Sequence, residues 1–353
     1  MLNNTFKKKM MRVFYLLIIL LFLSCNREIT PVKVINNPNF KTDVTISFGS
    51  CNNQNIKNIL FKEILKNKPK AFIWGGDAVY SDTKNPLLLK QNFENFKKDS
   101  TYQKFKNKLE ILGTWDDHDY GVNDGGFENP IKEEAQQLFL DFLDVPETDE
   151  RRQREGVYYS KTIKKDSNSV KVILLDTRYF RTALTKDRFS TKRYKPNKYG
   201  VGTMLGEMQW QWLEKELQNS KANFNVIVSS IQFLSDKHGF ESWGNMPHEQ
   251  DRFVNLLLKY TNNNTIILSG DRHIAEISKR NIGKFYYPLV DFTSSGLTHA
   301  YTGFSGEENP FRESNVIHQI NFGILKFDFK HKKVRFEIRG KGNLLLTLFE
   351  QKY

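Results

Sequence analysis

Short apolar segments that end in metal-binding or acid/base residues constrain the fold of this chain most. Four such segments lead into the motifs FGSC (48–51), GGDAVY (75–80), WDDHD (115–119) and SGDRH (269–273). The apolar runs are short, often β-branched and bounded by turn residues, which is the pattern of strands buried in a sheet. Polar residues therefore appear repeatedly where a strand stops, and this repetition predicts one site built from several strand ends.

Strand-like and helical segments alternate along most of the remaining sequence. Strands are predicted at 44–49, 71–74, 109–114, 170–175, 224–230 and 265–268. Apolar residues at helical spacing predict helices at 55–67, 86–107, 129–143, 206–219 and 248–260. In the helix at 206–219, Met208, Trp212, Leu213 and Leu217 form one apolar stripe, so this helix is expected to pack on the core.

The pattern changes after about residue 284, where strands predominate. They are predicted at 285–293, 316–329, 333–339 and 344–349. No Gly/Ser-rich linker and no repeat divides the sequence, so we expect one α/β domain over residues 44–353. Residues 181–203 are basic, contain Pro196, Gly200 and Gly202, and predict a long surface loop near a site.

The first 25 residues have the layout of an export signal. Basic residues precede an unbroken apolar run from Val13 to Leu23, which is too short to span a bilayer, and Ser24 and Cys25 follow it. This arrangement resembles a bacterial lipoprotein signal, although Phe22 stands where leucine is usual. The resemblance implies a signal peptide at 1–24, lipid on Cys25, and a protein anchored to the cell envelope by lipid. Residues 25–43 are polar and aperiodic, and we expect them to be a flexible tether.

Lipid on Cys25 changes the expected role of the other cysteine. Cys25 and Cys51 are the two cysteines of the sequence, so Cys51 is left without an intramolecular disulfide partner. It is then either a small buried apolar residue or a ligand.

The net charge constrains the partners weakly. Removal of residues 1–24 takes away four basic residues and no acidic one, so the net charge falls from +13 to +9. The basic residues are scattered, as on solvated faces, and they would attract anionic substrates or acidic surfaces. No nucleic-acid-binding motif accompanies them, so no specific nucleic-acid partner is predicted. The sequence does not indicate an oligomeric state.

The first two motifs supply soft and hard metal ligands together. Gly75 and Gly76 allow a tight turn that leaves the Asp77 carboxylate at a strand end, and Tyr80 follows three residues later. Together with the Cys51 thiolate, this carboxylate and phenolate suit iron(III) better than magnesium or calcium alone. Taken singly, Asp77 could be a helix cap and Tyr80 a packing residue.

The other two motifs combine carboxylates with histidine. In 115–119, three carboxylates flank His118 and would repel one another unless a cation or the imidazolium offset their charge. The alternative is an acidic turn with a capping aspartate. Asp271 and His273 are two residues apart, and in extended backbone they would share one face and reach a common metal cluster.

These motifs, in this order, resemble those of the PhoD-like alkaline phosphatases within the metallophosphoesterases. The resemblance covers about residues 44–340 and includes LLDTR (174–178), the segment 205–230 and DFTSSGLTH (291–299), with HGFESWGNMPHE (238–249) as a subgroup variant. It implies a four-layer α/β/β/α sandwich of two mixed sheets flanked by helices. It also implies a phosphoric ester hydrolase.

The resemblance also implies roles for individual residues. Iron would take Cys51, Asp77, Tyr80 and His273, while a calcium ion or another divalent metal would share Asp77 and add Asp117 and Asp271. His118 would contact phosphate or the leaving oxygen and be oriented by Asp119. Arg178 and Asn123 would bind phosphate, and His299 would line the pocket.

The implied mechanism needs no covalent serine intermediate. Two adjacent cations would bind phosphate oxygens and generate hydroxide near neutral pH, Arg178 would neutralise developing charge, and His118 would assist the leaving group. The chain departs from common metallophosphoesterases at one position, where Gln232 follows the strand at 224–230 in place of a metal-binding histidine.

Several functions remain open from the sequence. The first is an exported phosphoesterase acting on small or polymeric phosphate esters, and a variant is a phosphodiesterase acting on lipid headgroups, teichoic-acid-like polymers or nucleotides. The loops at 181–203 and 236–248 are expected to set substrate size. A non-catalytic surface lipoprotein that keeps the fold as a binding platform is the alternative from another class. The positive charge leaves a DNA-degrading nuclease as a weaker one.

Overall fold

The computed structural model describes residues 40–260, 264–283 and 285–353. The predicted signal peptide at 1–24, Cys25 and most of the predicted tether at 25–43 lie outside the described residues. At the start of the described chain, Lys41 N–H donates to Asp328 Oδ2 (2.9 Å) and Asp43 N–H donates to the Phe327 carbonyl (2.8 Å). Residues 41–43 are therefore already fixed to the domain. Within these described ranges, no helix has both the length and the apolar character needed to cross a membrane.

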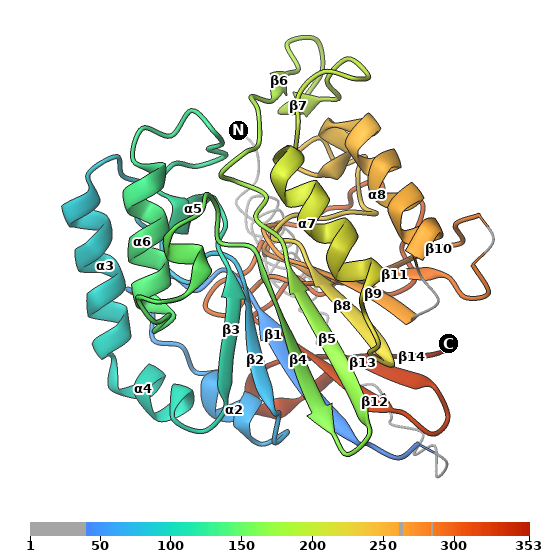
Figure 1. Cartoon of the computed structure of the whole chain (residues 1–353). Helices are drawn as coiled ribbons and strands as arrows, with labels where there is room; N and C mark the ends of the chain where they lie inside the picture. The colour runs from blue at the N-terminus through green and yellow to red at the C-terminus, as the bar shows by residue number, and fades with distance from the viewer. Residues whose placement is uncertain (1–39, 261–263, 284) are drawn as a thin grey trace, which may run out of the picture. The chain divides into compact units, whose positions relative to one another are not determined.

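The first of two six-stranded mixed sheets contains both the beginning and the end of the domain (Figure 1). Its order is β14-β13-β12-β1-β2-β3. The strands are β1 (Val44–Gly49), β2 (Ala71–Gly75), β3 (Glu110–Thr114), β12 (Phe322–Asp328), β13 (Lys333–Arg339) and β14 (Leu345–Lys352). β1, β2 and β3 are parallel, whereas β12 pairs antiparallel with β1.

The second sheet is built from the middle of the chain, in the order β10-β11-β9-β8-β5-β4. Its strands are β4 (Tyr159–Lys165), β5 (Asn168–Leu174), β8 (Phe224–Val228), β9 (Asn264–Ser269), β10 (Ala275–Arg280) and β11 (Leu289–Ser294). The four central strands are parallel, and β4 and β10 form antiparallel edges. A separate hairpin of β6 (Thr185–Lys186) and β7 (Tyr194–Lys195) projects from the loop at 181–203, at the top of Figure 1.

Aromatic side chains pack between the two sheets. Phe48 of β1 meets Phe292 of β11 edge-on, with 4.8 Å between ring centroids, and Phe292 in turn contacts Phe336 of β13 at 5.7 Å. At another point of the interface, Phe224 of β8 packs on Phe327 of β12 at 5.2 Å. These contacts join strands from both sheets face to face and form the middle of the core.

Helices cover the outer face of each sheet. The helices of the first half are α2 (Phe61–Leu65), α3 (Pro86–Lys98), α4 (Ser100–Lys106), α5 (Asp117–Tyr120) and α6 (Lys132–Phe142). The second sheet carries α7 (Gly206–Gln218) and α8 (Pro247–Tyr260), and short 3-10 helices lie at Glu150–Arg152, Trp243–Asn245 and Lys341–Asn343. The result is the expected four-layer sandwich of two mixed sheets flanked by helices.

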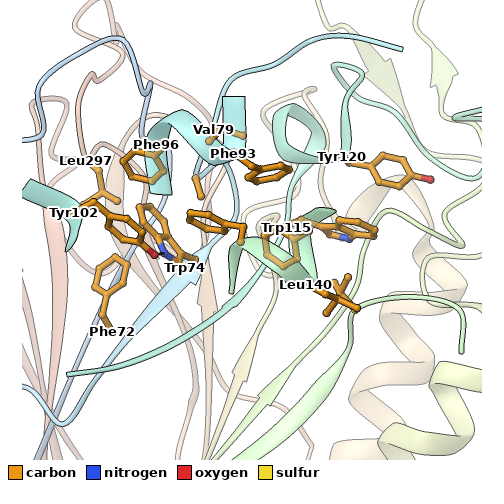
Figure 2. Close-up of a cluster of buried hydrophobic side chains, with 14 of the residues drawn as sticks. Phe72, Trp74, Val79, Phe93, Phe96, Tyr102, Trp115, Tyr120, Leu140 and Leu297 are labelled. Atoms are coloured by element: carbon orange, nitrogen blue, oxygen red, sulfur yellow. Dashed lines mark hydrogen bonds between the residues drawn. The ribbon is translucent and has the colours of Figure 1, made fainter. Parts of the chain in front are cut away.

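The outer layer of the first sheet is rich in aromatic rings, as Figure 2 shows. Phe72 and Trp74 of β2 contact each other edge-on, and Trp74 meets Phe96 of α3 and Tyr102 of α4. The rings of Phe96 and Tyr102 stack with centroids 4.6 Å apart. The predicted single helix at 86–107 is two helices. Asp99 separates them because its side chain caps the start of α4, accepting hydrogen bonds from the backbone N–H groups of residues 101 and 102.

The outer layer of the second sheet contains the predicted helix at 206–219. Trp210, Leu213 and Leu217 are buried in the cluster that α7 and α8 form over the sheet. Met208, which was expected in the apolar stripe, is 68% exposed. Trp210 is buried where Met208 was expected, so the buried face of α7 is rotated relative to the prediction.

The sequence located the buried parallel strands but missed the polar edge strands. Predicted strands match β1, β2, β3, β5, β8 and β9 to within two residues at each end. β4 buries Ile163 among basic and exposed neighbours, and β10 buries the polar Glu276 and Ser278, so neither presents an apolar run. The predicted strand at 316–329 is shorter, covering only 322–328, and the one at 285–293 begins at residue 289.

The contact between the sheets yields a stability prediction. Phe292→Ala should lower the free energy of unfolding by about 3–5 kcal/mol, because it removes a fully buried ring between Phe48 and Phe336. Phe189→Ala is the matched control, since the Phe189 ring is 91% exposed on the β6–β7 hairpin. Urea unfolding followed by fluorescence would compare them. Equal losses in the two variants would contradict this account of the core.

Candidate metal centre

The ends of strands from both sheets meet at one place. Cys51 follows β1, Asp77 follows β2 and Asp117 opens α5 just after β3, while Asp271 and His273 follow β9 of the other sheet. The two sheets are joined here because Ser50 forms a β-bridge with Ser295, and the Cys51 Sγ lies 3.0 Å from the Ser295 Oγ. The structure thus brings all the predicted metal ligands to one edge.

The four predicted iron ligands lie in mutual contact. Cys51 Sγ is 3.3 Å from Asp77 Oδ2, and Tyr80 Oη is 3.4 Å from the same oxygen. Tyr80 Oη is also 2.9 Å from His273 Nε2. Ligand atoms of Cys51, Asp77 and His273 all lie within 4.8 Å of one another, which is a compact donor set for one cation.

A carboxylate-rich cluster adjoins the first one. Asp77, Asp117 and His118 offer ligand atoms within 4.8 Å of one another, and so do Asp116, Asp117 and Asp271. Asp77 belongs to both regions, which is the position expected of a bridging ligand. Asp116 is an addition that sequence reasoning did not single out from the three carboxylates of 115–119.

Four of the predicted ligands have left-handed backbone conformations. The φ angles are 62° at Cys51, 52° at Asp77, 66° at Asp271 and 54° at His273. Such angles are uncommon outside glycine and cluster at functional sites. The expected extended alternation of Asp271 and His273 is therefore wrong, because both residues lie in a turn beyond β9 and converge through that turn.

Buried acids crowd the site, and their pKa values reflect it. Burial raises the pKa of the Cys51 thiol to about 12 and that of the Tyr80 phenol far above its usual range. Burial, reinforced by neighbouring anions, also raises the pKa values of the carboxyls of Asp77 and Asp271 well above normal. The protein alone thus disfavours the charged forms of these groups. A cation among them would reverse that preference, so the donor set fits bound metal ions.

His118 lies against this cluster. Its Nδ1 is 2.7 Å from Asp82 Oδ1, and its ring packs on Tyr80 with centroids 4.1 Å apart. Burial lowers the pKa of His118, but the hydrogen bond to Asp82 and the charges of Asp77 and Asp117 outweigh it and raise the pKa to about 10. The neighbouring carboxylates of the protein therefore favour a protonated imidazole.

Asp119 does not orient His118, contrary to the expectation from the resemblance. Its Oδ1 accepts a hydrogen bond from the Val79 backbone N–H (2.8 Å), and its Oδ2 accepts one from the Asp116 N–H (3.4 Å). Consecutive residues of a helix point in different directions, so the carboxylate after His118 faces the backbone behind the site. Asp82, from the loop between β2 and α3, takes the orienting position.

Arg178 is likewise directed away from its expected role. The guanidinium is fully buried, with Nε 2.6 Å from Asp116 Oδ1 and Nη1 2.5 Å from Glu241 Oε2. Arg181 Nε pairs with the other oxygen of Glu241 at 2.8 Å. Arg178 therefore joins the end of β3 to the loop at 236–248, and it acts as a positioning residue.

An open cavity of about 320 Å³ gives access to the cluster. The described residues that line it are Asp117, His118, Asn123, Asp124, Arg193, Phe240, Glu241, Asp271, Arg272, His273 and Tyr301. Asn123 is thus at the cavity, as expected, and Arg178 is not in this set. His299 packs behind the lining, edge-on to Tyr80 and His273, and burial lowers its pKa to about 4.

Sequence reasoning missed several lining residues although their segments were noticed. Arg193 belongs to the basic loop at 181–203, and Phe240 and Glu241 belong to 238–249. Arg272 stands inside the SGDRH motif between two predicted ligands. Gln232, which replaces a common metal-binding histidine, donates hydrogen bonds to Glu276 and Thr293 (both 2.9 Å), so the second sheet uses it structurally.

Comparison with known proteins decides the family. The sequence profile of the PhoD-like phosphatases matches residues 46–341. The chain belongs to the PhoD-like phosphatase family. Alkaline phosphatase D of Bacillus subtilis (strain 168) is 22% identical over 304 residues, covering 72% of this chain and 51% of that protein. The chain therefore spans about half the length of this PhoD-like relative.

Solved structures share the fold. The structure of PhoD superposes with a TM-score of 0.67 at 18% identity, over 88% of this chain and 69% of that one. A dimetal phosphatase from Danio rerio superposes with a TM-score of 0.51 at 10% identity, over 89% of this chain and all of the other. The two mixed sheets and their helical layers are thus those of the PhoD-like fold.

The buried ion pairs behind this PhoD-like site lead to a prediction. Arg178→Met should lower the free energy of unfolding by about 3 kcal/mol or more, because Asp116 and Glu241 lose a buried countercharge. Arg252→Met removes an exposed arginine paired with Glu207 and should cost less than about 1 kcal/mol. Urea titration of both variants measures the difference. A loss of stability in Arg178→Met no larger than in the control would refute the positioning role.

Proposed function

We propose that this protein is a metal-dependent phosphoesterase that hydrolyses phosphate esters with a metal-activated hydroxide. One observation carries the proposal: groups of candidate ligand atoms are linked through Asp77 and Asp117, and Asp117, Asp271 and His273 of these groups line an open cavity. Membership of the PhoD-like phosphatase family supports it, as does the fold shared with a dimetal phosphatase.

Iron(III) and calcium are the proposed metals. Cys51, Tyr80 and His273 would hold iron because thiolate, phenolate and imidazole together suit a transition metal. Asp117 and Asp271 would hold calcium or another divalent ion, since carboxylate oxygens suit hard cations. Asp77 would bridge the two. When bound, these metals supply positive charge to phosphate oxygens and make a water molecule acidic enough to attack phosphorus.

The protein's own residues would orient the ester and supply a proton. His118 lines the cavity, and the hydrogen bond to Asp82 raises the pKa of its imidazole, so it is suited to protonate the leaving oxygen as a general acid. Asp82 holds the imidazole at Nδ1, while Nε2 lies 4.0 Å from Asp117 Oδ1, beside the proposed metal ligands. Asn123 at the rim is an additional donor for an ester oxygen.

The substrate class follows from the shape of the cavity. The loops at 181–203 and 236–248 contribute Arg193, Phe240 and Glu241, so they are the segments that would set the size of the ester. The cavity is open, which suits small monoesters as well as diesters, including lipid-headgroup or polymer diesters. The bacterial relative is named alkaline phosphatase D, which favours phosphate esters generally.

The proposed location is the cell envelope. Export by the signal at 1–24 and lipidation of Cys25 would hold the enzyme at a membrane surface, with the following residues as a tether.

The metal ligands can be tested at the cysteine. Cys51→Ser should lose iron and reduce turnover by at least about 100-fold, because replacing a direct ligand costs more than the 10–100-fold of an outer-shell change. Metal analysis and hydrolysis of p-nitrophenyl phosphate and its bis-ester would be measured together. Cys25→Ser is the matched control and should keep both metal and turnover. Unchanged iron and activity in Cys51→Ser would make Cys51 a packing residue, and absence of turnover in the metal-loaded wild type would favour a binding protein.

The same two variants test the lipid anchor, with Cys25→Ser as the test and Cys51→Ser as the control. Cys25→Ser should move the protein from the membrane fraction to the soluble fraction, since a lipid chain is its proposed attachment. Cys51→Ser should stay in the membrane fraction. Fractionation of cells expressing each variant, with metabolic labelling by a fatty acid, gives the measurement. A labelled, membrane-bound Cys25→Ser protein would contradict the proposal.

A further inference from the structure

We propose that Arg272 binds the phosphoryl oxygens of the substrate, in the place that the family resemblance gave to Arg178. This inference rests on the proposed phosphoesterase function and names the anion-binding group of its site.

The position of Arg272 is fixed from two sides. Its guanidinium lies over the Phe240 ring, 3.9 Å from the centroid, and Nη2 donates to Glu307 Oε1 at 2.7 Å. Phe240 comes from the loop at 236–248 and Glu307 from the segment after His299. The side chain is only 10% exposed, although it lines the cavity. Arg272 is therefore a preoriented cation at the cavity wall.

One donor of this guanidinium lacks a partner. Arg272 Nε is buried and finds no hydrogen-bond acceptor among the described residues. A buried donor without an acceptor costs about 1–3 kcal/mol, and more when the group is charged. The planar fork of arginine matches two oxygens of a phosphate, so a turn of the guanidinium toward the cavity would give this buried donor a phosphoryl acceptor.

The sequence position places Arg272 beside the proposed metals. Asp271 and His273, which flank it, are predicted ligands of the second cation and of iron respectively, and all three line the same cavity. An ester oxygen held by the metals would thus have Arg272 at the adjoining wall. The aromatic face of Phe240 behind the guanidinium excludes water from one side and strengthens the charge–oxygen contact.

The other two arginines near the site are less suited to this task. Arg178 is committed to Asp116 and Glu241 behind the cavity. Arg193 lines the cavity and, like Arg272, pairs with one carboxylate (Asp124 Oδ2, 2.6 Å), but its side chain is half exposed and therefore less firmly held. Arg272 combines burial, cavity access and a free donor.

The test measures binding of inorganic phosphate to the metal-loaded protein, together with the kcat and KM of p-nitrophenyl phosphate. In Arg272→Met, phosphate affinity should fall about 10–100-fold, as expected for loss of a charge-assisted hydrogen bond. Metal content and melting temperature should match the wild type. Arg272→Lys should recover part of the affinity because it keeps the charge, and millimolar guanidinium should partly rescue Arg272→Met. Arg280→Met is the matched control, since Arg280 stacks on Phe311 outside the cavity, and it should retain phosphate affinity.

The outcomes separate this inference from the proposed function. The wild-type protein could bind phosphate but hydrolyse no ester, and Arg272→Met could weaken that binding. This result would refute the proposed function and support the anion site. Phosphate affinity unchanged in Arg272→Met would overturn the anion site while leaving the phosphoesterase intact. Loss of metal in Arg272→Met would show a supporting role for the ligand turn and would also overturn it. A larger effect from Arg193→Met than from Arg272→Met would assign the site to Arg193 instead.

Discussion

Repulsion among buried carboxylates is the constraint around which this protein is organised. Asp77, Asp116, Asp117 and Asp271 converge at the ends of strands from two sheets, and all four are at most slightly exposed. Their charge is offset from behind by the Arg178 guanidinium, which pairs with Asp116. On the cavity side, the donor set is suited to metal ions. Because Arg178 pairs with Asp116, the carboxylates of Asp77, Asp117 and Asp271 remain available as metal ligands on the cavity side.

The site also depends on a stiff frame that holds uncommon backbone conformations. Four predicted ligands have positive φ angles, which a flexible loop would relax. Hydrogen bonds between strand ends of the same sheet oppose this relaxation. In the first sheet, Asn52 N–H donates to the Asp77 carbonyl at 2.8 Å, and in the second, His273 N–H donates to Ser295 Oγ at 2.8 Å. The positions of the donor atoms are therefore a property of both sheets together.

Sequence reasoning recovered the parts of the fold that bury apolar strands and the motifs that end them. β1, β2 and β9 are short, buried strands rich in apolar residues, so their ends could be located, and with them Cys51, Asp77 and Asp271. Side-chain direction after a strand could not be predicted in the same way. Asp82 rather than Asp119 meets His118, and Arg178 turns inward to Glu241, because these partners are set by loops and by burial in the folded core. The position of Arg272 in the cavity wall could not be predicted either, because its partners Phe240 and Glu307 come from other loops.

The pairing of β1 with β12 has a consequence for the order of assembly. β1 holds the strand end that carries Cys51, yet its neighbour on one side is made from residues 322–328. Contacts between such distant segments form slowly, because the entropy cost of closing a long loop comes before the contacts stabilise the chain. A chain emerging from its N-terminus cannot complete the first sheet until nearly all of it is present. The proposed iron site likewise joins Cys51 to His273, which are far apart in the sequence, so a metal held by both would require most of the domain to have folded.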